Sequence, residues 1–303
     1  APAIAAGCTS VVKPSSQTPL SMLALADILR EAGVPDGVVN LVTTSKAGEV
    51  MEPLIRSGLA RKLSFTGSTA VGRHLLEQCA DKVLRTSMEL GGNAAFIVFP
   101  DADLDAALEG ALGAKMRNAG QSCSAANRFY VHVDVLDEFS HRLAQQMSEL
   151  PMGRGTEPGI RLGPLINETA RDTVQALVED AVASGARLQT GGKTVSGDGY
   201  LYPPTVLTEV PKSALMRHED IFGPVAAISS FKTEDEVITA ANDTRYGLVN
   251  YVYTNEIHRA MRVADAIECG IVWAAPGSVR AIAGTLGGGA DTGLHGDAER
   301  EGR

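Results

Sequence analysis

Residues 62–80 read KLSFTGSTAVGRHLLEQCA and pass from a strand pattern to a helical pattern through a short turn. We expect a strand over residues 62–66 and a helix over residues 68–80. In the turn, Gly67 and Ser68 stand where backbone N–H groups and a helix dipole can hold a phosphate. A plain strand-to-helix turn would use the same residues, so this stretch alone leaves both interpretations open.

The same alternation of strand and helix patterns continues on both sides of that segment. Thr18 is expected as the N-cap of a helix over residues 18–33, with Pro19 in its first turn. The other expected strands are 9–12, 38–44, 84–90, 94–99 and 127–133, and the other expected helices are 46–57, 103–116, 135–150 and 168–185. Short connections between such elements predict an α/β protein with a parallel sheet covered by helices, which binds ligands at the strands' carboxyl ends.

The chain length of 303 residues suggests about two domains. The Gly91-Gly92 pair interrupts the alternation, so we expect a first domain over residues 1–90 and a second over residues 91–274. Residues 275–303 are Gly-rich and polar without periodicity, which predicts an irregular tail.

Composition excludes several classes of protein. The formal net charge of −9 and the lack of a basic run argue against binding to nucleic acid or to an anionic membrane. No apolar segment reaches the roughly 18 residues that span a bilayer, and no signal-peptide pattern opens the chain, so a cytoplasmic location is expected. The four cysteines show neither a disulfide framework nor a zinc motif.

Cys123 lies in the stretch NAGQSCSAANR, residues 118–128, among small and amide-bearing residues. A reactive thiol needs such a polar setting, although loops also contain inert cysteines. Glu89 ends an expected strand just before Gly91-Gly92, and a carboxylate beside a thiol can serve as a general base. The pair of Cys123 and Glu89 is therefore the catalytic hypothesis. The six histidines show no HExxH motif or i, i+4 pair, so no metal site and no Cys–His dyad is favoured.

Six motifs in order resemble the aldehyde dehydrogenase superfamily over roughly residues 1 to 273. They are KPSSQTP (13–19), SFTGSTAVG (64–72), MELGGN (88–93), NAGQSC (118–123), EDIFGP (219–224) and NDTRYGL (242–248). The segments RTSMELGGNAAFIVF and AKMRNAGQSCSAANRF are similar to the succinate-semialdehyde dehydrogenase branch. The resemblance implies an α/β fold with a partial Rossmann-type NAD(P)-binding domain and an α/β catalytic domain.

The resemblance also implies a reaction. Cys123 would attack the aldehyde carbonyl to give a thiohemiacetal, a hydride would pass to the nicotinamide, and Glu89 would activate the water that hydrolyses the thioester. The Cys123 backbone N–H would be one oxyanion donor. Arg117, six residues before the thiol, would bind the distal carboxylate of a semialdehyde, while a surface arginine at a helix end is the alternative.

For the cofactor, the resemblance places Lys13 at the adenosine ribose, Gly67 and Ser68 at the pyrophosphate, and Phe222 at the nicotinamide. Asp220 stands where the family usually has a glutamate on the nicotinamide ribose. Ser16 stands where NAD-preferring relatives often carry a glutamate, and its small hydroxyl would not repel a 2′-phosphate. We therefore expect NADP, or NAD, as the cofactor.

Departures from the family pattern keep alternatives open. The first cofactor-domain strands and the family's oxyanion asparagine are expected upstream of residue 1, and the tail departs from the family's PFGGxKxSG-type segment. The chain could thus be a truncated, non-catalytic remnant or a dinucleotide-binding module. A thiol acyltransferase is disfavoured because it explains neither Lys13 nor the 67–69 turn. A homo-oligomer is typical of the family and doubtful for this chain.

Overall fold

The computed structural model describes residues 2–195, 197 and 199–275, and these residues belong to two compact units. One unit contains residues 1–63 and 76–85, and the other contains residues 64–75 and 86–303. The predicted tail falls, from residue 276 onward, outside the described residues. The domain boundaries expected from the sequence stay predictions.

The first unit is built from short elements in the predicted order. They are α1 (Pro2–Ala5), β1 (Ser10–Val12), α2 (Leu20–Glu31), β2 (Val39–Leu41) and α3 (Ala47–Arg56). Strands β1 and β2 pair in parallel, with Ser10 opposite Val39 and Val12 opposite Leu41. A parallel pair needs a crossover connection, and helix α2 supplies it here. These elements confirm the strand and helix patterns predicted for residues 9–57.

The start of helix α2 differs from the prediction. Pro19, not Thr18, occupies the N-cap position, and no side chain caps the helix there. The proline backbone is already in the right-handed helical region, at φ −77° and ψ −22°. Because proline fixes φ near the helical value, the helix start can form without a hydroxyl cap. The expected capping role of Thr18 is therefore wrong.

The quoted segment 62–80 folds as predicted, into β3 (Lys62–Thr66) followed by helix α4 (Thr69–Ala80). Strand β3 pairs with β4 (Arg85–Glu89) in a two-stranded sheet. The sequence pattern predicted one parallel sheet through this region, whereas β1–β2 and β3–β4 form separate pairs within the described residues. The Gly67 N–H donates to the carbonyl oxygen of Glu89 at 3.0 Å, which fixes the turn beside the end of β4.

The second unit contains a seven-stranded sheet in the order β11-β10-β5-β6-β9-β8-β7. The strands are β5 (Ala94–Val98), β6 (Ala126–His132), β7 (Arg187–Thr190), β8 (Thr205–Thr208), β9 (Val225–Phe231), β10 (Val249–Tyr253) and β11 (Ile271–Ala275). Every neighbouring pair is parallel except β7 with β8, which is antiparallel. The α/β fold class is confirmed, with one antiparallel edge strand added to the predicted parallel sheet.

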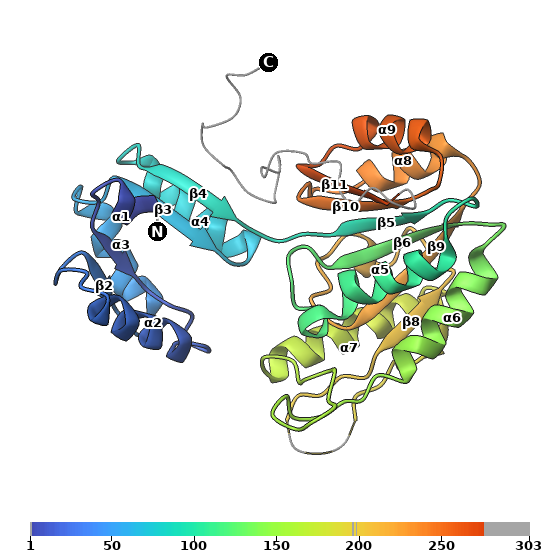
Figure 1. Ribbon diagram of the computed structural model, residues 1–303, viewed down its shortest axis with the longest axis horizontal. Coiled ribbons are helices and arrows are strands. Elements are labelled where there is room, and N and C mark those ends of the chain that lie inside the picture. The colour runs from blue at the N-terminus through green and yellow to red at the C-terminus, as the bar shows by residue number, and fades with distance from the viewer. Residues whose placement is uncertain (1, 196, 198, 276–303) are drawn as a thin grey trace. The chain divides into compact units, whose positions relative to one another are not determined.

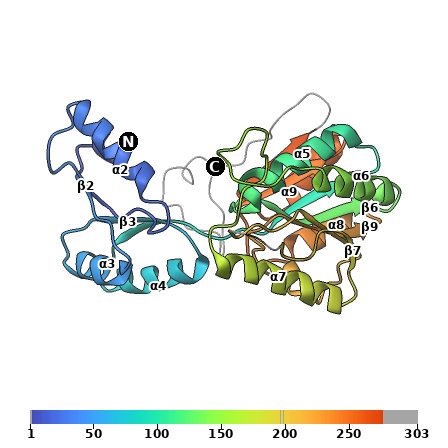
Figure 2. The same ribbon diagram turned by 90° about the horizontal axis from the view of Figure 1, so that it is seen from below.

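Helices cover both faces of this sheet (Figure 1). The helices are α5 (Leu104–Met116), α6 (Leu136–Ser148), α7 (Glu168–Ala183), α8 (Glu234–Asn242) and α9 (Ile257–Ala266), and the short 3-10 turns are η1 (Arg117–Gly120) and η2 (Leu215–Arg217). Buried residues of α5, α6 and α7 share one apolar cluster, and those of α8 and α9 share another. Helices α5 and α6 lie side by side in both views (Figures 1 and 2).

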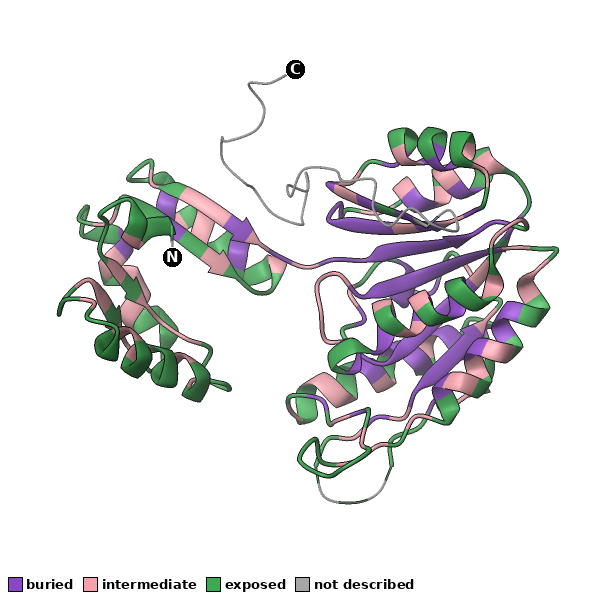
Figure 3. Ribbon diagram, viewed as in Figure 1, coloured by how far each residue is buried: buried purple, intermediate pink, exposed green. Residues whose placement is uncertain are grey.

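Strand β5 explains why this sheet has two apolar faces. All five of its residues are buried (Figure 3). Phe96 and Val98 belong to the cluster with α5–α7, whereas Ala95 and Ile97 belong to the cluster with α8 and α9. Successive strand residues point to opposite faces, so an uninterrupted apolar run is what a strand covered on both sides requires. The residues just before and after such strands become candidates for a site.

Candidate active site

Cys123 lies in the loop between α5 and β6. Helix α5 ends at Met116, and the chain then turns through Asn118 and Ala119, which have φ values of 52° and 56°. The Asn118 side chain donates to the Gln121 carbonyl at 3.0 Å, and the Gln121 side chain donates to the Asn118 carbonyl at 3.1 Å. Left-handed backbone at two non-glycine residues is unfavourable, so this reciprocal pair helps to keep the loop in place.

The environment of the Cys123 thiol is partly buried and negatively charged. Burial raises the pKa of the thiol, and the carboxylate charge of Glu89 raises it further, as does the charge of Asp220. The backbone N–H groups of Cys123 and Ser124 act in the opposite direction. The resting thiol is therefore protonated near neutral pH, and it lies within electrostatic range of Glu89. Their joint catalytic role stays a prediction.

The Gly91-Gly92 pair brings the chain after Glu89 against the cysteine loop. A Cβ atom on Gly92 would overlap the carbonyl oxygen of Cys123. A Cβ on Gly91 would lie 3.1 Å from the Tyr246 ring and 3.2 Å from the Thr69 hydroxyl. Glycines allow such a close approach, and the Cys123 backbone is the group that approaches Gly92.

Asp220 lies between this glycine pair and a buried lysine. Its carboxylate accepts from the Gly92 N–H at 3.3 Å and from the Asn127 amide at 3.2 Å. Asn127 in turn accepts from the Lys115 ammonium at 2.8 Å. Burial raises the pKa of Asp220, and the hydrogen bonds and the Lys115 charge oppose that shift. The cofactor role expected for Asp220 stays a prediction. Phe222 nearby is 42% exposed and adopts a positive φ of 45°.

Arg117 occupies the C-cap position of α5 and is exposed. Burial raises the pKa of the Tyr251 hydroxyl to about 12; the charge of Cys123 also raises it, and the positive charge of Arg117 opposes the shift. Tyr251 donates to the carbonyl oxygen of Ser124 at 2.8 Å. Arg117 and Cys123 therefore both act electrostatically on the same tyrosine, with opposite effects on its pKa. Both the substrate role and the helix-end role of Arg117 remain compatible with this position.

Sequence reasoning missed Lys115, Asn127 and Tyr251. Lys115 is 1% exposed and Asn127 is fully buried, although polar residues in helix and strand patterns usually face solvent. The available signal was the position of Lys115 two residues before Arg117, in the last turn of a helix that leads into the cysteine loop. Tyr251 follows the buried β10 residues Val249 and Asn250 and gave no separate signal.

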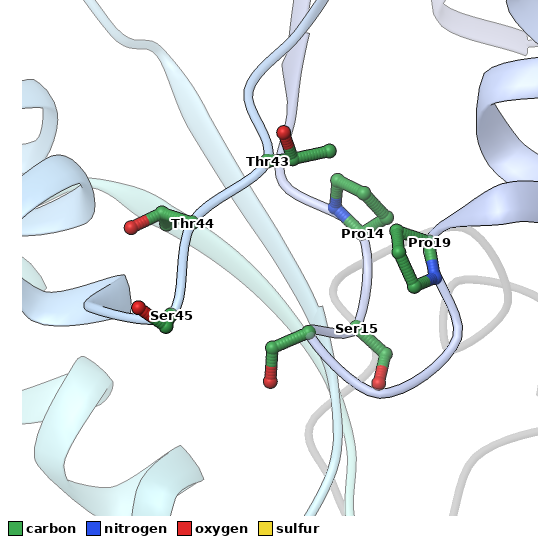
Figure 4. Close-up of a pocket in the computed structure, with 7 residues that line it drawn as sticks. Pro14, Ser15, Pro19, Thr43, Thr44 and Ser45 are labelled. Carbon is green, nitrogen blue, oxygen red and sulfur yellow. The ribbon is translucent and has the colours of Figure 1, made fainter.

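Two sequence-predicted cofactor residues lie in the first unit. A pocket of about 290 Å³ is lined by Pro14, Ser15, Ser16, Pro19, Thr43, Thr44 and Ser45 (Figure 4). Its polar side chains are all hydroxyls, and no acidic side chain lines it. The Lys13 ammonium lies next to it in sequence and donates to the Pro14 carbonyl at 2.8 Å. Such a pocket fits the hydroxyls or the 2′-phosphate of a nucleotide ribose, because it presents donors without a repelling carboxylate.

Gly67 and Ser68 lie at the N-terminus of α4. The Ser68 hydroxyl accepts from the Val71 N–H at 3.4 Å, which is the geometry of an N-cap. A Cβ on Gly67 would overlap the tip of the Phe65 ring, so a larger residue at 67 would require that ring to move. The start of a twelve-residue helix attracts phosphate through its N–H groups and dipole, which fits a pyrophosphate.

The described residues offer neither a metal site nor a membrane-spanning helix. No group of three or more His, Cys, Asp and Glu side chains there could hold a metal ion. Over the same residues, each helix is too short or too polar to cross a bilayer.

The sequence matches the model of the aldehyde dehydrogenase family over residues 1–302, which extends beyond the resemblance noted over roughly residues 1 to 273. The chain is 49% identical to a succinate-semialdehyde dehydrogenase of Paenarthrobacter nicotinovorans over 302 residues, which cover 100% of this chain and 67% of the relative. It is 52% identical to the succinate-semialdehyde dehydrogenase (NADP(+)) GabD of Escherichia coli K12 over 271 residues, which cover 89% of this chain and 56% of the relative.

A crystal structure described as an E. coli NADP dependent enzyme superposes with a TM-score of 0.92 at 50% identity, over 97% of this chain and 61% of that one. The chain thus spans between 56% and 67% of the length of these relatives. The match over nearly every residue, together with the fold, shows that the chain belongs to the aldehyde dehydrogenase family.

Proposed function

We propose that the protein oxidises succinate semialdehyde, or a related aldehyde with a distal carboxylate, to the carboxylic acid with NAD(P) as the oxidant. The observation that carries this proposal is the shared environment of Cys123 and Glu89, in which the carboxylate charge acts on a partly buried thiol. The names of the two relatives, both succinate-semialdehyde dehydrogenases, support the choice of substrate.

The first step makes a carbon–sulfur bond. Because the Cys123 thiol is protonated at rest, a base must remove its proton, and Glu89 is the carboxylate whose charge acts most strongly on it. The thiolate then attacks the aldehyde carbon, and the carbonyl oxygen takes up negative charge. The N–H of Cys123 is the donor proposed for that oxygen, because it already lies against the sulfur.

The second half of the reaction returns the enzyme to its starting state. When bound, the oxidised nicotinamide supplies a two-electron acceptor for the hydride on the substrate carbon. Loss of that hydride leaves a thioester on Cys123. Glu89, which has by then released the Cys123 proton to solvent, takes a proton from a water that attacks the thioester carbon. The carbon–sulfur bond breaks, Cys123 leaves as the thiolate, and its sulfur regains a proton from Glu89.

The proposed cofactor contacts use residues at three places in the chain. The hydroxyl-lined pocket that includes Ser16, with Lys13 beside it, would hold the adenosine ribose and accept NADP as well as NAD. Gly67 and Ser68 would bind the pyrophosphate at the start of α4. The partly exposed Phe222 ring would contact the nicotinamide. The name of the E. coli relative supports NADP.

The substrate contact proposed for this chain is Arg117. Its guanidinium would pair with the distal carboxylate of the semialdehyde in a forked geometry. Its exposure at the end of α5, near Tyr251 and the cysteine loop, leaves the charge accessible to a ligand. A cytoplasmic location stays a prediction from the sequence, and a homo-oligomer, which is typical of the family, stays doubtful for this chain.

A turnover assay tests the proposal. The purified chain is incubated with succinate semialdehyde and either NADP or NAD, and the absorbance of the reduced nicotinamide is followed beside a Cys123→Ala control. The proposal expects cofactor reduction that the control lacks. Dinucleotide binding without any reduction would favour the binding module, and thioester exchange without a cofactor would favour the acyltransferase.

A further inference from the structure

Lys115 is a buried cation that the proposed reaction does not use. It lies in the last turn of α5 and is 1% exposed, and its ammonium donates to Asn127 at 2.8 Å. Burial lowers the pKa of Lys115 to about 7, while the charge of Asp220 acts in the opposite direction. A buried ammonium is costly, so it persists in a fold only with partners of this kind.

Asp220 is bound within the protein on both of its carboxylate oxygens. Oδ1 accepts from the Asn127 amide at 3.2 Å, and Oδ2 accepts from the Gly92 N–H at 3.3 Å. The N–H of Phe222 also favours its ionised form. These three donors occupy most of the roughly four acceptor positions of a carboxylate, so a ribose hydroxyl would compete for the little capacity that is left.

The same network binds Gly92 at both of its peptide groups. Asp220 accepts from its N–H, and Asn127 donates to its carbonyl oxygen at 3.4 Å. Gly92 lies directly against the Cys123 carbonyl, where a Cβ would overlap that oxygen. Fixing the Gly92 backbone therefore fixes one wall of the cysteine loop.

We propose that Lys115, Asn127 and Asp220 form one internal network that positions Gly92 against Cys123, and that Asp220 serves this network instead of binding the cofactor ribose. This role rests on the proposed function, in which Cys123 is the nucleophile. Asp220 is one methylene shorter than the glutamate usual in the family, and the shorter side chain keeps its carboxylate on protein donors. These three are positioning residues, because they act on the reaction through the cysteine loop.

The test compares two single variants and their double variant by two measurements on the full chain. Asp220→Asn removes the negative charge, Lys115→Met removes the positive charge at similar volume, and the double variant removes both. The exposed residues Asp235 and Lys193 provide matched controls, Asp235→Asn and Lys193→Met. The measurements are the dissociation constant for NADP and the rate at which iodoacetamide alkylates Cys123, read by mass spectrometry at pH ~6.5, where Lys115 carries its charge.

The network predicts opposite changes in alkylation. Asp220→Asn should speed alkylation at least about twofold, because the Asp220 charge raises the thiol pKa. Lys115→Met should slow it by a similar factor, because the Asp220 charge is then no longer offset, and the double variant should fall between the two. None of the three should change the NADP dissociation constant more than about threefold.

Two outcomes would overturn the proposal. One is an NADP dissociation constant that rises more than about threefold in Asp220→Asn, which would return Asp220 to the ribose. The other is an alkylation rate that stays at the wild-type value in both single variants. If one single variant does not fold, the other single variant, measured beside its matched control, decides the matter. Alkylation requires no turnover, so a failure of the proposed dehydrogenase activity would leave this result readable.

Discussion

Gly92 lies so close to Cys123 that a single added methyl group would overlap the carbonyl oxygen of the cysteine. The obstructing atom belongs to the backbone, so it cannot rotate away as a side chain could. The chain that follows Glu89 at the end of β4 therefore packs through a glycine against the loop that contains Cys123. The distance between Glu89 and Cys123 depends on that contact.

Gly92→Ala should consequently displace the cysteine loop. We expect overpacking to lower the free energy of unfolding by about 1–3 kcal/mol. The value of kcat should fall by a larger fraction than the free energy of unfolding does. Urea unfolding and steady-state kinetics measure the two quantities. Gly113→Ala is the matched control, because nothing lies within 4 Å of a Cβ at that helical position, and it should gain about 0.5–1 kcal/mol. Wild-type kinetics in Gly92→Ala would contradict the packing argument.

Glu89→Gln should have opposite effects on thiol reactivity and on turnover. Burial is the larger cause of the raised pKa of Cys123, and the Glu89 charge is the next. Removal of that charge should lower the pKa of Cys123 and speed alkylation by iodoacetamide about twofold to fivefold. Turnover should nevertheless fall by about 10² or more, since the proposed general base is gone.

The exposed Glu109 on α5 gives the control variant Glu109→Gln, which should leave both rates near the wild-type values. Cys8, which is exposed, serves as an internal reference for the alkylating reagent. Slower alkylation of Cys123 in Glu89→Gln would mean that the two groups do not share an electrostatic environment.

Local periodicity was enough to predict most elements, because each strand and helix depends on residues close in sequence. The strand expected over residues 62–66 begins and ends at those residues in the structure. The helix expected over residues 103–116 begins one residue later, with Asp103 as its N-cap. Strand order was beyond this approach. Strand β10 lies between β11 and β5, and its pairing with β5 joins residues more than 150 positions apart, such as Tyr251 and Phe96.

The candidate site was predictable only where a motif surrounded a reactive residue. Cys123 and Glu89 stand in such motifs, whereas Lys115 resembles any polar residue of an amphipathic helix until burial is known. Its partner Asn127 is twelve positions further along the chain, and Asp220 is far more distant in sequence. A network of this kind exists only through the tertiary fold, so no local pattern indicates it.

Asp101 should make the stability of the second unit depend on pH. It accepts from Thr254, from the Asn255 N–H at 2.9 Å and from Arg259 at 2.6 Å, which ties the end of β5 to the start of α9. Burial raises the pKa of Asp101, but these hydrogen bonds and the Arg259 charge outweigh it, so the net pKa is lowered.

A lowered pKa stabilises the folded state above the ordinary pKa of about 4, and that contribution is lost as the pH falls through the folded-state value. Asp101→Asn should therefore cost about 1 kcal/mol at pH ~7, a figure reduced for partial exposure, and the difference from wild type should shrink under acid. Thermal unfolding across pH measures this, with the exposed Asp265→Asn as the control. A difference that grows in acid would contradict the sign.

Arg117→Leu should raise KM for succinate semialdehyde by about tenfold to a hundredfold and leave KM for a neutral aldehyde such as propanal nearly unchanged. Arg117→Lys keeps the charge but not the forked geometry, so it should give an intermediate value. Steady-state kinetics with both aldehydes separate the two interpretations of this residue. Equal changes for the charged and the neutral substrate would assign Arg117 to the helix end alone.

Ser16→Glu should move the cofactor preference from NADP toward NAD. The pocket around Ser16 is lined by hydroxyls and lacks a carboxylate, so a glutamate there would repel a 2′-phosphate and accept from a 2′-hydroxyl. We expect kcat/KM for NADP relative to NAD to fall by about tenfold or more. Ser16→Gln has the same size without the charge and should shift that ratio much less. A wild-type chain that already strongly prefers NAD would contradict the role proposed for Ser16. Equal shifts in the two variants would also contradict it, because the size of the side chain and not its charge would then control the preference.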